Sequence, residues 1–219
     1  MHLAPGLITA LAAIEKRLGG ALAIVSGRPV DALDRFLDPW RPTLAAEHGS
    51  LLRLADGTLF APPPPDLLPA ETAASTLAAA HPRLYVERKT AAIALHYRSA
   101  PELEELCRHS LSSVVALDPA LELLEGKYVV EVKPAGTNKG RAISALMDRP
   151  PFAGRRPLFA GDDTTDEAGF ASVQALGGQG IKVGGGETIA VHRCASPDVV
   201  RSWLAATLPA GHPAALALQ

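Results

Sequence analysis

The stretch LFAGDDTTDEAGF at residues 158–170 joins a short apolar run to a dense group of acidic residues. The apolar run predicts a buried β-strand, and the acidic residues follow the point where that strand ends. Asp162, Asp163, Asp166 and Glu167 all fall within this one segment. Carboxylates this close together repel one another unless a cation or hydrogen bonds compensate them. The stretch therefore predicts either a cation site or a charged helix start at the end of a strand.

The same succession of an apolar run and polar residues occurs twice earlier in the chain. ALAIV (21–25) precedes SGR (26–28), and TLAAEHG (43–49) ends in EHG. Periodicity predicts helices over 5–18, 30–37, 139–147, 165–176 and 197–208, and further short strands at 180–184 and 190–194. This alternation is typical of a parallel α/β sheet covered by helices on both faces. Because ligands of such sheets bind at the carboxyl ends of the strands, the sequence predicts one shared site there.

The middle of the chain, residues 61–134, follows a different pattern. It begins with the proline-rich linker APPPPD (61–66), which favours extended structure. A helix near 66–80, a hairpin formed by RLYVERK and AIALHYR, a helix over 101–113, and a strand pair formed by LELLEG and KYVVEVKP are predicted next. We therefore predict an α+β cap domain at 61–134, inserted into a core made of residues 1–60 and 135–219.

Composition and charge argue against several classes of protein. The hydrophobic content of 47% is ample for a packed core, and the net charge of −2 argues against a nucleic-acid partner. No apolar run approaches the ~20 residues that a membrane helix requires, and residues 1–20 predict an amphipathic helix rather than a signal peptide. Cys107 and Cys194 show no metal-ligand or redox spacing and predict buried thiols. We expect a cytoplasmic monomer with neither nucleic-acid nor membrane partners.

Each polar motif, taken alone, has two interpretations. The acidic stretch can be a helix N-terminus with capping side chains, or a set of oxygen ligands for Mg²⁺, which takes a few carboxylates and a phosphate. SGR can be a plain turn, or it can offer a hydroxyl and a guanidinium to phosphate oxygens. Lys139 can be a solvated surface residue, but a cation at a helix start is more favourable if it faces an anion or the acidic cluster.

Four segments taken together carry a family resemblance: IVSGRPVDALDRFL, LAAEHGSLLR, GKYVVEVKPAGTNKGRAI and FAGDDTTDEAGF, with the ERK…HYR hairpin of the insert. Over essentially its whole length the chain resembles the trehalose-phosphatase family of the haloacid dehalogenase superfamily. The resemblance implies a Rossmann-like parallel-sheet core with an inserted cap that sets substrate specificity. It also implies that trehalose 6-phosphate is hydrolysed to trehalose and phosphate in trehalose biosynthesis, through an aspartate nucleophile and bound Mg²⁺.

The resemblance also implies roles for individual residues. Ser26 matches the hydroxyl that holds the phosphoryl oxygens, and Lys139 matches the cation beside nucleophile and phosphate. Asp162 matches a metal ligand, with Asp163 or Asp166 supporting the metal shell. The positions matched to substrate binding are Gly27, Arg28, Glu47, His48 and Gly49 in the core, and Glu87, Arg98, Lys127 and Glu131 in the insert. Lys127 and Glu131 are four apart on one predicted strand and would face the same side, although alternating charges also suit a solvated sheet face.

One family motif has no counterpart in the sequence. The family's first strand ends in Asp-x-Asp-Gly-Thr, whose first aspartate attacks phosphorus. The similar string LADGTLF (54–60) has Leu54 in place of that nucleophile, and Asp56-Gly57 between LLRL and TLF predicts a hairpin turn. We therefore expect an N-terminally truncated, inactive member with a groove between the strands that precede SGR and GDD. The alternatives are a non-catalytic sugar-phosphate-binding or regulatory module, and another capped sugar phosphatase.

Overall fold

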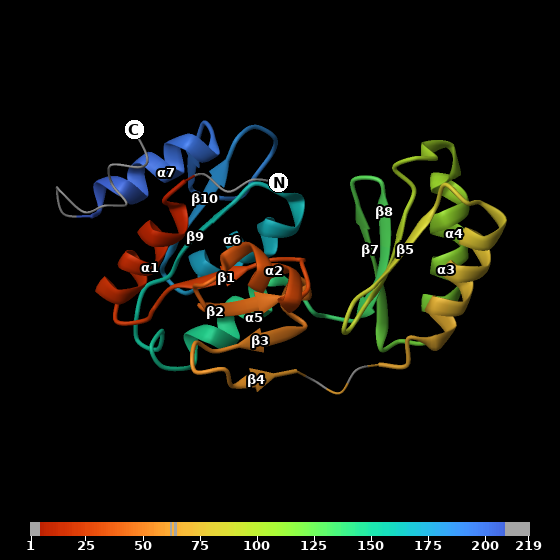
Figure 1. Cartoon of the computed structure of the whole chain (residues 1–219), viewed down its shortest axis with the longest axis horizontal. Coiled ribbons are helices and arrows are strands. Elements are labelled where there is room, and N and C mark those ends of the chain that lie inside the picture. Colours follow the sequence, from red (N-terminus) through yellow and green to blue (C-terminus); the bar gives the residue numbers. More distant parts are fainter. Residues whose placement is uncertain (1–4, 62, 64, 209–219) are drawn as a thin grey trace. The chain divides into compact units, whose positions relative to one another are not determined.

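The computed structural model of the chain describes residues 5–61, 63 and 65–208 (Figure 1). Residues 1–4 and 209–219 and two prolines of the predicted linker, Pro62 and Pro64, lie outside the described residues. The chain divides into two compact units, Met1–Phe60 with Asn138–Gln219, and Ala61–Thr137. We call them the core unit and the cap unit and describe each by itself. The second boundary lies three residues beyond the predicted one.

The core unit alternates strands and helices as the apolar runs predict. Its elements in chain order, with η for a 3-10 turn, are α1 (Leu7–Arg17), β1 (Ala23–Val25), α2 (Val30–Leu37), β2 (Thr43–Ala46), η1 (Glu47–Gly49), β3 (Leu51–Arg53), β4 (Leu59–Phe60), α5 (Lys139–Met147), β9 (Leu158–Gly161), η3 (Thr164–Asp166), α6 (Glu167–Ala175), β10 (Gln179–Val183), β11 (His192–Cys194) and α7 (Pro197–Ala206). The helices predicted over 30–37 and 139–147 have these bounds in the structure.

Within the described residues, the core strands form two sheets rather than one. The first has the order β1-β2-β3-β4, with β1 and β2 parallel and the later pairs antiparallel. The second has the order β11-β10-β9 and is wholly parallel. The turn between β3 and β4 contains Asp56, whose carboxylate accepts a hydrogen bond from the Thr58 N–H at 2.8 Å. The predicted hairpin turn is confirmed.

Strand β2 shows how helices cover both faces of the first sheet. All four of its residues are buried. Successive side chains of a strand point to opposite faces. Ala45 packs in one apolar cluster with the helix α5, whereas Leu44 and Ala46 pack in another with α2 and with Ile8 of α1. The first turn of α1 therefore packs in the same cluster as α2.

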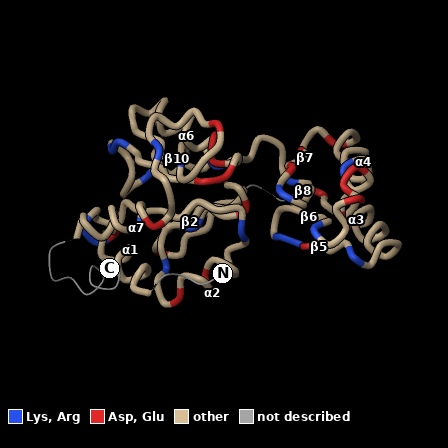
Figure 2. Tube along the Cα trace, turned by 90° about the horizontal axis from the view of Figure 1, so that it is seen from above, with Lys and Arg blue, Asp and Glu red and all other residues tan. Residues whose placement is uncertain are grey.

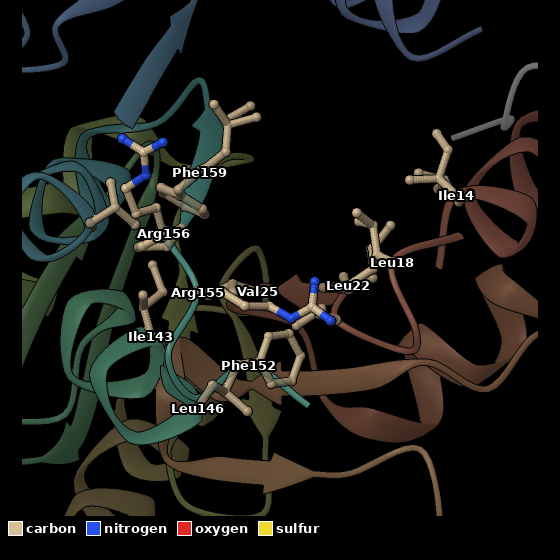
Figure 3. A pocket seen from close by; sticks show the side chains of 18 of the residues that line it. Ile14, Leu18, Leu22, Val25, Ile143, Leu146, Phe152, Arg155, Arg156 and Phe159 are labelled. Carbon is tan, nitrogen blue, oxygen red and sulfur yellow. The ribbon is translucent and has the colours of Figure 1, made fainter. Parts of the chain in front are cut away.

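A cavity of about 980 Å³ lies between β1 and β9, with apolar side chains such as Leu22, Val25 and Phe159 around it (Figure 3). Consecutive residues of both strands, 23–25 and 158–160, line it. Because alternate side chains point to opposite faces, consecutive residues line a cavity only where the edge of the strand faces it. Neither β1 nor β9 pairs with another described strand on that edge. The groove expected between these two strands is present.

The cap unit is an antiparallel sheet with helices on one face. Its elements are α3 (Leu68–Ala80), β5 (Tyr85–Arg88), β6 (Ile93–His96), η2 (Pro101–Leu103), α4 (Glu104–Val115), β7 (Leu121–Gly126) and β8 (Val129–Pro134). The strand order is β5-β6-β8-β7. Apolar residues of β6 and β8 pack against α3 and α4, with the buried Cys107 among them. Cys107 and the half-buried Cys194 are both free thiols. No helix in the described part of the chain could span a membrane.

Candidate active site

Backbone hydrogen bonds join the loop after β1 to the turn after β2. The Ser26 N–H donates to the carbonyl of Ala45 at 2.8 Å, and the His48 N–H donates to the carbonyl of Ser26 at 3.0 Å. The Glu47 N–H donates to the carbonyl of Arg28 at 3.1 Å. The Ser26 hydroxyl accepts a weaker bond from the Arg28 N–H at 3.2 Å. Ser26 is thus held by its backbone at the carboxyl end of β1.

Two glycines of these segments allow unusually close packing. Glu47 and His48 have φ values of +48° and +57°, in the left-handed region that is costly for residues with a Cβ. The turn brings the His48 ring onto Gly27, where a Cβ would lie 2.4 Å from the ring. A Cβ at Gly49 would lie 2.8 Å from the carbonyl oxygen of Asn138. The EHG turn therefore lies directly against the start of α5.

Lys139, the first residue of α5, is buried and ion-paired. Its ammonium donates to Oδ1 of Asp166 at 2.6 Å, and the two side chains are only 9% and 5% exposed. The helix start itself is capped by Asn138, whose side chain accepts from the Arg141 N–H at 2.9 Å. A lysine at this position opposes the helix dipole, and its pairing with a carboxylate offsets that cost. Of the two interpretations of Lys139, a solvated surface residue or a cation that faces the acidic stretch, the structure shows the second.

Asp166 organises the acidic stretch from inside. Its Oδ2 accepts hydrogen bonds from the N–H groups of Asp162 and Asp163, both at 2.8 Å. The close approach requires Gly161, because a Cβ there would lie 2.4 Å from the carboxylate of Asp166. Asp163 and Asp166 together form a capping box at the start of η3. Protein donors thus occupy both oxygens of Asp166, which caps the helix start and pairs with Lys139. Its expected part in supporting the metal shell stays a prediction.

Asp162 differs from its neighbours, because its side chain is exposed and has no partner among the described residues. Its backbone carbonyl accepts a hydrogen bond from Nζ of Lys182 at 2.8 Å. Lys182 is buried in β10 and lies 4.0 Å from Oε1 of Glu167. Figure 2 shows the acidic stretch in red at the start of α6. Sequence reasoning missed Lys182, although a single lysine in the apolar run GIKVG was a signal of a buried cation.

These contacts connect the polar ends of three strands. Ser26 is bonded to His48, and the turn containing His48 packs against the start of α5. Lys139 at that start is paired with Asp166, which holds the backbone of Asp162. The structure therefore brings together the residues that follow β1, β2 and β9, together with Lys139. A hydroxyl, an ammonium and a free carboxylate at one edge can bind a phosphoryl group and its counter-ion.

The donor set of this edge is suited to Mg²⁺ but not to a metal that needs a full protein cage. In the described ranges, no three His, Cys, Asp or Glu side chains are grouped so that they could hold a metal ion. Mg²⁺ keeps several waters and commonly binds through one or two carboxylates plus substrate phosphate. The exposed carboxylate of Asp162 meets that requirement. Asp163 is also exposed, although its Oδ1 accepts from the Thr164 N–H at 2.7 Å.

In the cap unit, the sheet face opposite α3 and α4 is polar. Glu87 and Glu131 both pair in register with Ala94, one from each side, so their side chains share this face. Oε2 of Glu87 lies 2.8 Å from Nε2 of His96. Glu131 forms an ion pair with Lys89, and both side chains are less than a tenth exposed. The carboxylates of this face are therefore oriented by neighbouring cationic or imidazole groups.

Lys127 and Arg98 lie outside the strands of the cap sheet. The prediction that Lys127 and Glu131 share one strand is wrong, because β8 begins at Val129 and Lys127 is in the preceding turn. Tyr128 has a φ of +65°, which turns the chain between β7 and β8. The guanidinium of Arg98 lies 5.2 Å from the centre of the Tyr128 ring, a cation–π distance. Lys127 thus directly precedes Tyr128, the residue whose ring contacts the guanidinium of Arg98.

Comparison with known proteins identifies the family. A sequence profile of the trehalose-phosphatase family matches residues 1–195. The chain belongs to the trehalose-phosphatase family. The trehalose-6-phosphate phosphatase of Escherichia coli (strain K12) is 43% identical over 187 residues, which are 84% of this chain and 70% of that protein.

Solved structures place this trehalose-phosphatase family member among haloacid dehalogenase-like folds. A trehalose-6-phosphate phosphatase related protein has a TM-score of 0.76 at 25% identity, over 93% of this chain and 86% of that one. A haloacid dehalogenase-like hydrolase from B. subtilis, 14% identical, has a TM-score of 0.60 over 89% of each chain and shows the fold alone. The predicted family and fold class, an α/β core with an inserted cap, are confirmed.

Proposed function

We propose that this chain is a Mg²⁺-dependent trehalose-6-phosphate phosphatase of trehalose biosynthesis, which releases trehalose and inorganic phosphate. The observation that carries the proposal is the 43% identity to the E. coli trehalose-6-phosphate phosphatase over 84% of the chain. The linked polar groups at the strand ends of the core unit support it, because they supply the chemistry that phosphoryl transfer needs.

In the core unit, each polar side chain has a distinct role toward the phosphate. The Ser26 hydroxyl donates a hydrogen bond to a phosphoryl oxygen, and Arg28 and His48 border the same loop. The ammonium of Lys139, held in place by Asp166, offsets the negative charge of the phosphoryl group. Asp162 would hold Mg²⁺, with Asp163 in support, and the ion would supply further neutralisation of phosphate charge. These groups bind and orient phosphate without providing the nucleophile.

In the cap unit, the polar sheet face and its adjoining turn would recognise the sugar. Carboxylates accept hydrogen bonds from sugar hydroxyls, and Glu87 and Glu131 are already oriented by His96 and Lys89. Lys127 and Arg98 would donate to sugar oxygens. Replacing Lys127 by Ala should raise the KM for trehalose 6-phosphate more than it lowers kcat, because Lys127 binds sugar rather than phosphate.

We further propose that residues 1–219 by themselves turn over little substrate. The family's nucleophile is a carboxylate at a strand end, and the one similar string places Asp56 in a turn where Thr58 holds its carboxylate. The cavity between β1 and β9 offers two strand edges that pair with no other described strand, and these strands lead to Ser26 and Asp162. A strand between them that runs parallel to both would end at this polar edge and could present such a carboxylate.

The test compares the 219-residue chain with the same chain extended at its N-terminus by an apolar strand ending in Asp-x-Asp-Gly-Thr. Inorganic phosphate release is measured with trehalose 6-phosphate or glucose 6-phosphate, in Mg²⁺ or in EDTA. We expect Mg²⁺-dependent, trehalose 6-phosphate-selective turnover by the extended chain alone. Equal turnover by the 219-residue chain would refute the need for an added nucleophile. Equal use of both sugars would refute the proposed substrate.

A non-catalytic role in sugar-phosphate binding is the second candidate, because Glu87, Arg98, Lys127 and Glu131 all lie within the cap unit. Calorimetry of the 219-residue chain with trehalose 6-phosphate tests it. Binding that Lys127→Ala weakens, without phosphate release, would favour this role. An absence of binding heat, measured at several temperatures, would exclude it.

A further inference from the structure

Strand β10 contains one buried lysine, Lys182, among mostly apolar residues. Lys182 pairs in register with Gly161 of β9, the residue just before the acidic stretch. Its side chain is 5% exposed. Lysines are rarely buried to this degree unless their ammonium group is paired or hydrogen-bonded. Here Nζ donates to the carbonyl oxygen of Asp162 at 2.8 Å and lies 4.0 Å from Oε1 of Glu167.

Both backbone polar groups of Asp162 are held by buried ionised side chains. Its N–H donates to Asp166 at 2.8 Å, and its carbonyl oxygen accepts from Lys182 at 2.8 Å. The carboxylate of Asp162, in contrast, is exposed and unpartnered within the described chain. Hydrogen bonds to ionised groups are stronger than those between neutral groups. A firmly held backbone with a free side chain is the arrangement expected of a ligand that must meet an ion in one fixed direction.

The same lysine connects this loop to a second one. Oε2 of Glu167 accepts a hydrogen bond from the Ile189 N–H at 2.9 Å, while Oε1 faces Lys182. Gln174 of α6 binds the Ile189 carbonyl at 3.1 Å and the Val191 N–H at 3.0 Å. The segment between β10 and β11 is thereby fastened to α6 at Ile189 and Val191. Lys182 therefore lies beneath the loops that follow β9 and β10.

We infer that Lys182 is a positioning residue, which fixes the backbone of Asp162 so that the Asp162 carboxylate is directed toward a bound Mg²⁺. The inference rests on the proposed function only in taking Asp162 as the ligand. Lys182 does not touch substrate or metal in this account. It acts through the Asp162 carbonyl.

The positive charge of Lys182 and its hydrogen bond to Asp162 have opposite expected effects on Mg²⁺ affinity. The direction in which the affinity changes when Lys182 is replaced therefore tests the inference. Removing a positive charge close to Asp162 would by itself strengthen the binding of a cation. Losing the hydrogen bond that holds the Asp162 carbonyl would weaken it. If positioning dominates, Lys182→Met binds Mg²⁺ more weakly than the parent chain, by about tenfold, as for other residues that orient metal ligands.

The experiment uses the whole 219-residue chain labelled with ¹⁵N. Mg²⁺ is titrated while the Asp162 and Asp163 amide signals are followed, and exchange of these amides is measured separately without Mg²⁺. The matched control is Lys133→Met, which removes another buried lysine, the one paired with Glu122 in the cap unit. A third variant, Lys182→Gln, keeps a donor for the carbonyl but loses the charge.

We expect weaker Mg²⁺ binding and faster Asp162 amide exchange in Lys182→Met, partial rescue in Lys182→Gln, and parental values in Lys133→Met. Unchanged or tighter binding in Lys182→Met would overturn the inference, as would equal weakening in the control. If Lys182→Met does not fold, the test uses Lys182→Gln and Asp162→Asn. A Mg²⁺ affinity of Lys182→Gln equal to that of the parent chain supports positioning through the hydrogen bond. A Mg²⁺ affinity as weak as that of Asp162→Asn refutes it. Because none of these readouts involves phosphate release, failure of the proposed activity is separable from failure of the inference.

Discussion

Replacing Asp166 by Asn tests whether the acidic stretch is built around one inward-facing carboxylate. The substitution keeps the size of the side chain and removes its charge. Lys139 would then be left buried beside a neutral group, with its side chain only 9% exposed and little water to compensate its charge. The remaining amide oxygen can still accept from the two backbone N–H groups, as Oδ2 does, but the amide NH₂ group then replaces the oxygen that pairs with Lys139.

The expected cost follows from burial. Removing one partner of a buried ion pair typically costs about 3–5 kcal/mol. Because Asn retains one acceptor, we expect a loss near the lower limit, about 3 kcal/mol of the free energy of unfolding. For a chain of this size that corresponds to a fall of roughly 6–12 °C in Tm. The exposed Asp162 has no partner to lose, so Asp162→Asn should change stability by less than about 0.5 kcal/mol and can raise it by relieving repulsion.

Urea unfolding without Mg²⁺ at neutral pH is the appropriate assay. Both tryptophans, Trp40 and Trp203, belong to the core unit, so their fluorescence reports on the unit that contains the substitution. The double variant Lys139→Met with Asp166→Asn is the control, because removing both charges should cost less than the sum of the single changes. A stability of Asp166→Asn within about 0.5 kcal/mol of the parent chain would show that the buried pair contributes little. A larger loss in Asp162→Asn than in Asp166→Asn would show that the stretch is not built around Asp166.

Three further outcomes are expected. Burial raises the pKa of Tyr97 to about 12, so the stability that this residue contributes is intact below about pH 10 and is lost as the pH rises toward 12. Tyr97→Phe should flatten that decline in a series of unfolding curves, and identical declines in the variant and the parent chain would contradict this expectation. Gly161→Ala should lower the free energy of unfolding by about 1–3 kcal/mol, because its Cβ would meet the carboxylate of Asp166. Gly185→Ala, with open space around it, should leave that free energy unchanged. Similar losses of stability for both variants in urea unfolding would argue against the clash. Asp56→Ala should leave phosphate release by the extended chain unchanged, since its carboxylate accepts a bond within a turn, and a large loss of turnover would assign it a catalytic role.

Local pattern was sufficient to predict most elements of this fold. The short apolar runs of the core predict strands that are buried on both faces. The alternating hairpin of the cap predicts strands because successive side chains of a strand point to opposite faces. Helices such as α2 and α5 follow from the 3.6-residue period of their apolar positions. The polar ends SGR, EHG and GDD predict a shared edge, since parallel strands end on the same side of a sheet. These inferences depend on neighbours in the sequence and on general rules of connection.

The individual roles of the acidic residues could not be predicted in the same way. Asp162, Asp163 and Asp166 are the same residue type within one short segment, and residue type alone does not distinguish the inward-facing carboxylate from the outward-facing one. The missing Cβ of Gly161 and the arrival of Lys139 from α5 make that choice. Lys127 was misplaced for a related reason, because the strand-like pattern of KYVVEVKP continues through a turn that Tyr128 adopts at positive φ.

Residue type and spacing were enough to predict the family, the strand–helix order, the inserted cap and the set of polar residues at the strand ends. Which of those residues are partners follows from the packing of the folded chain. Lys139 meets Asp166 across 27 positions, and Lys182 reaches the Asp162 carbonyl across 20. Such pairings depend on how strands and helices pack, since burial leaves each charged group only the partners that the fold brings within hydrogen-bonding distance.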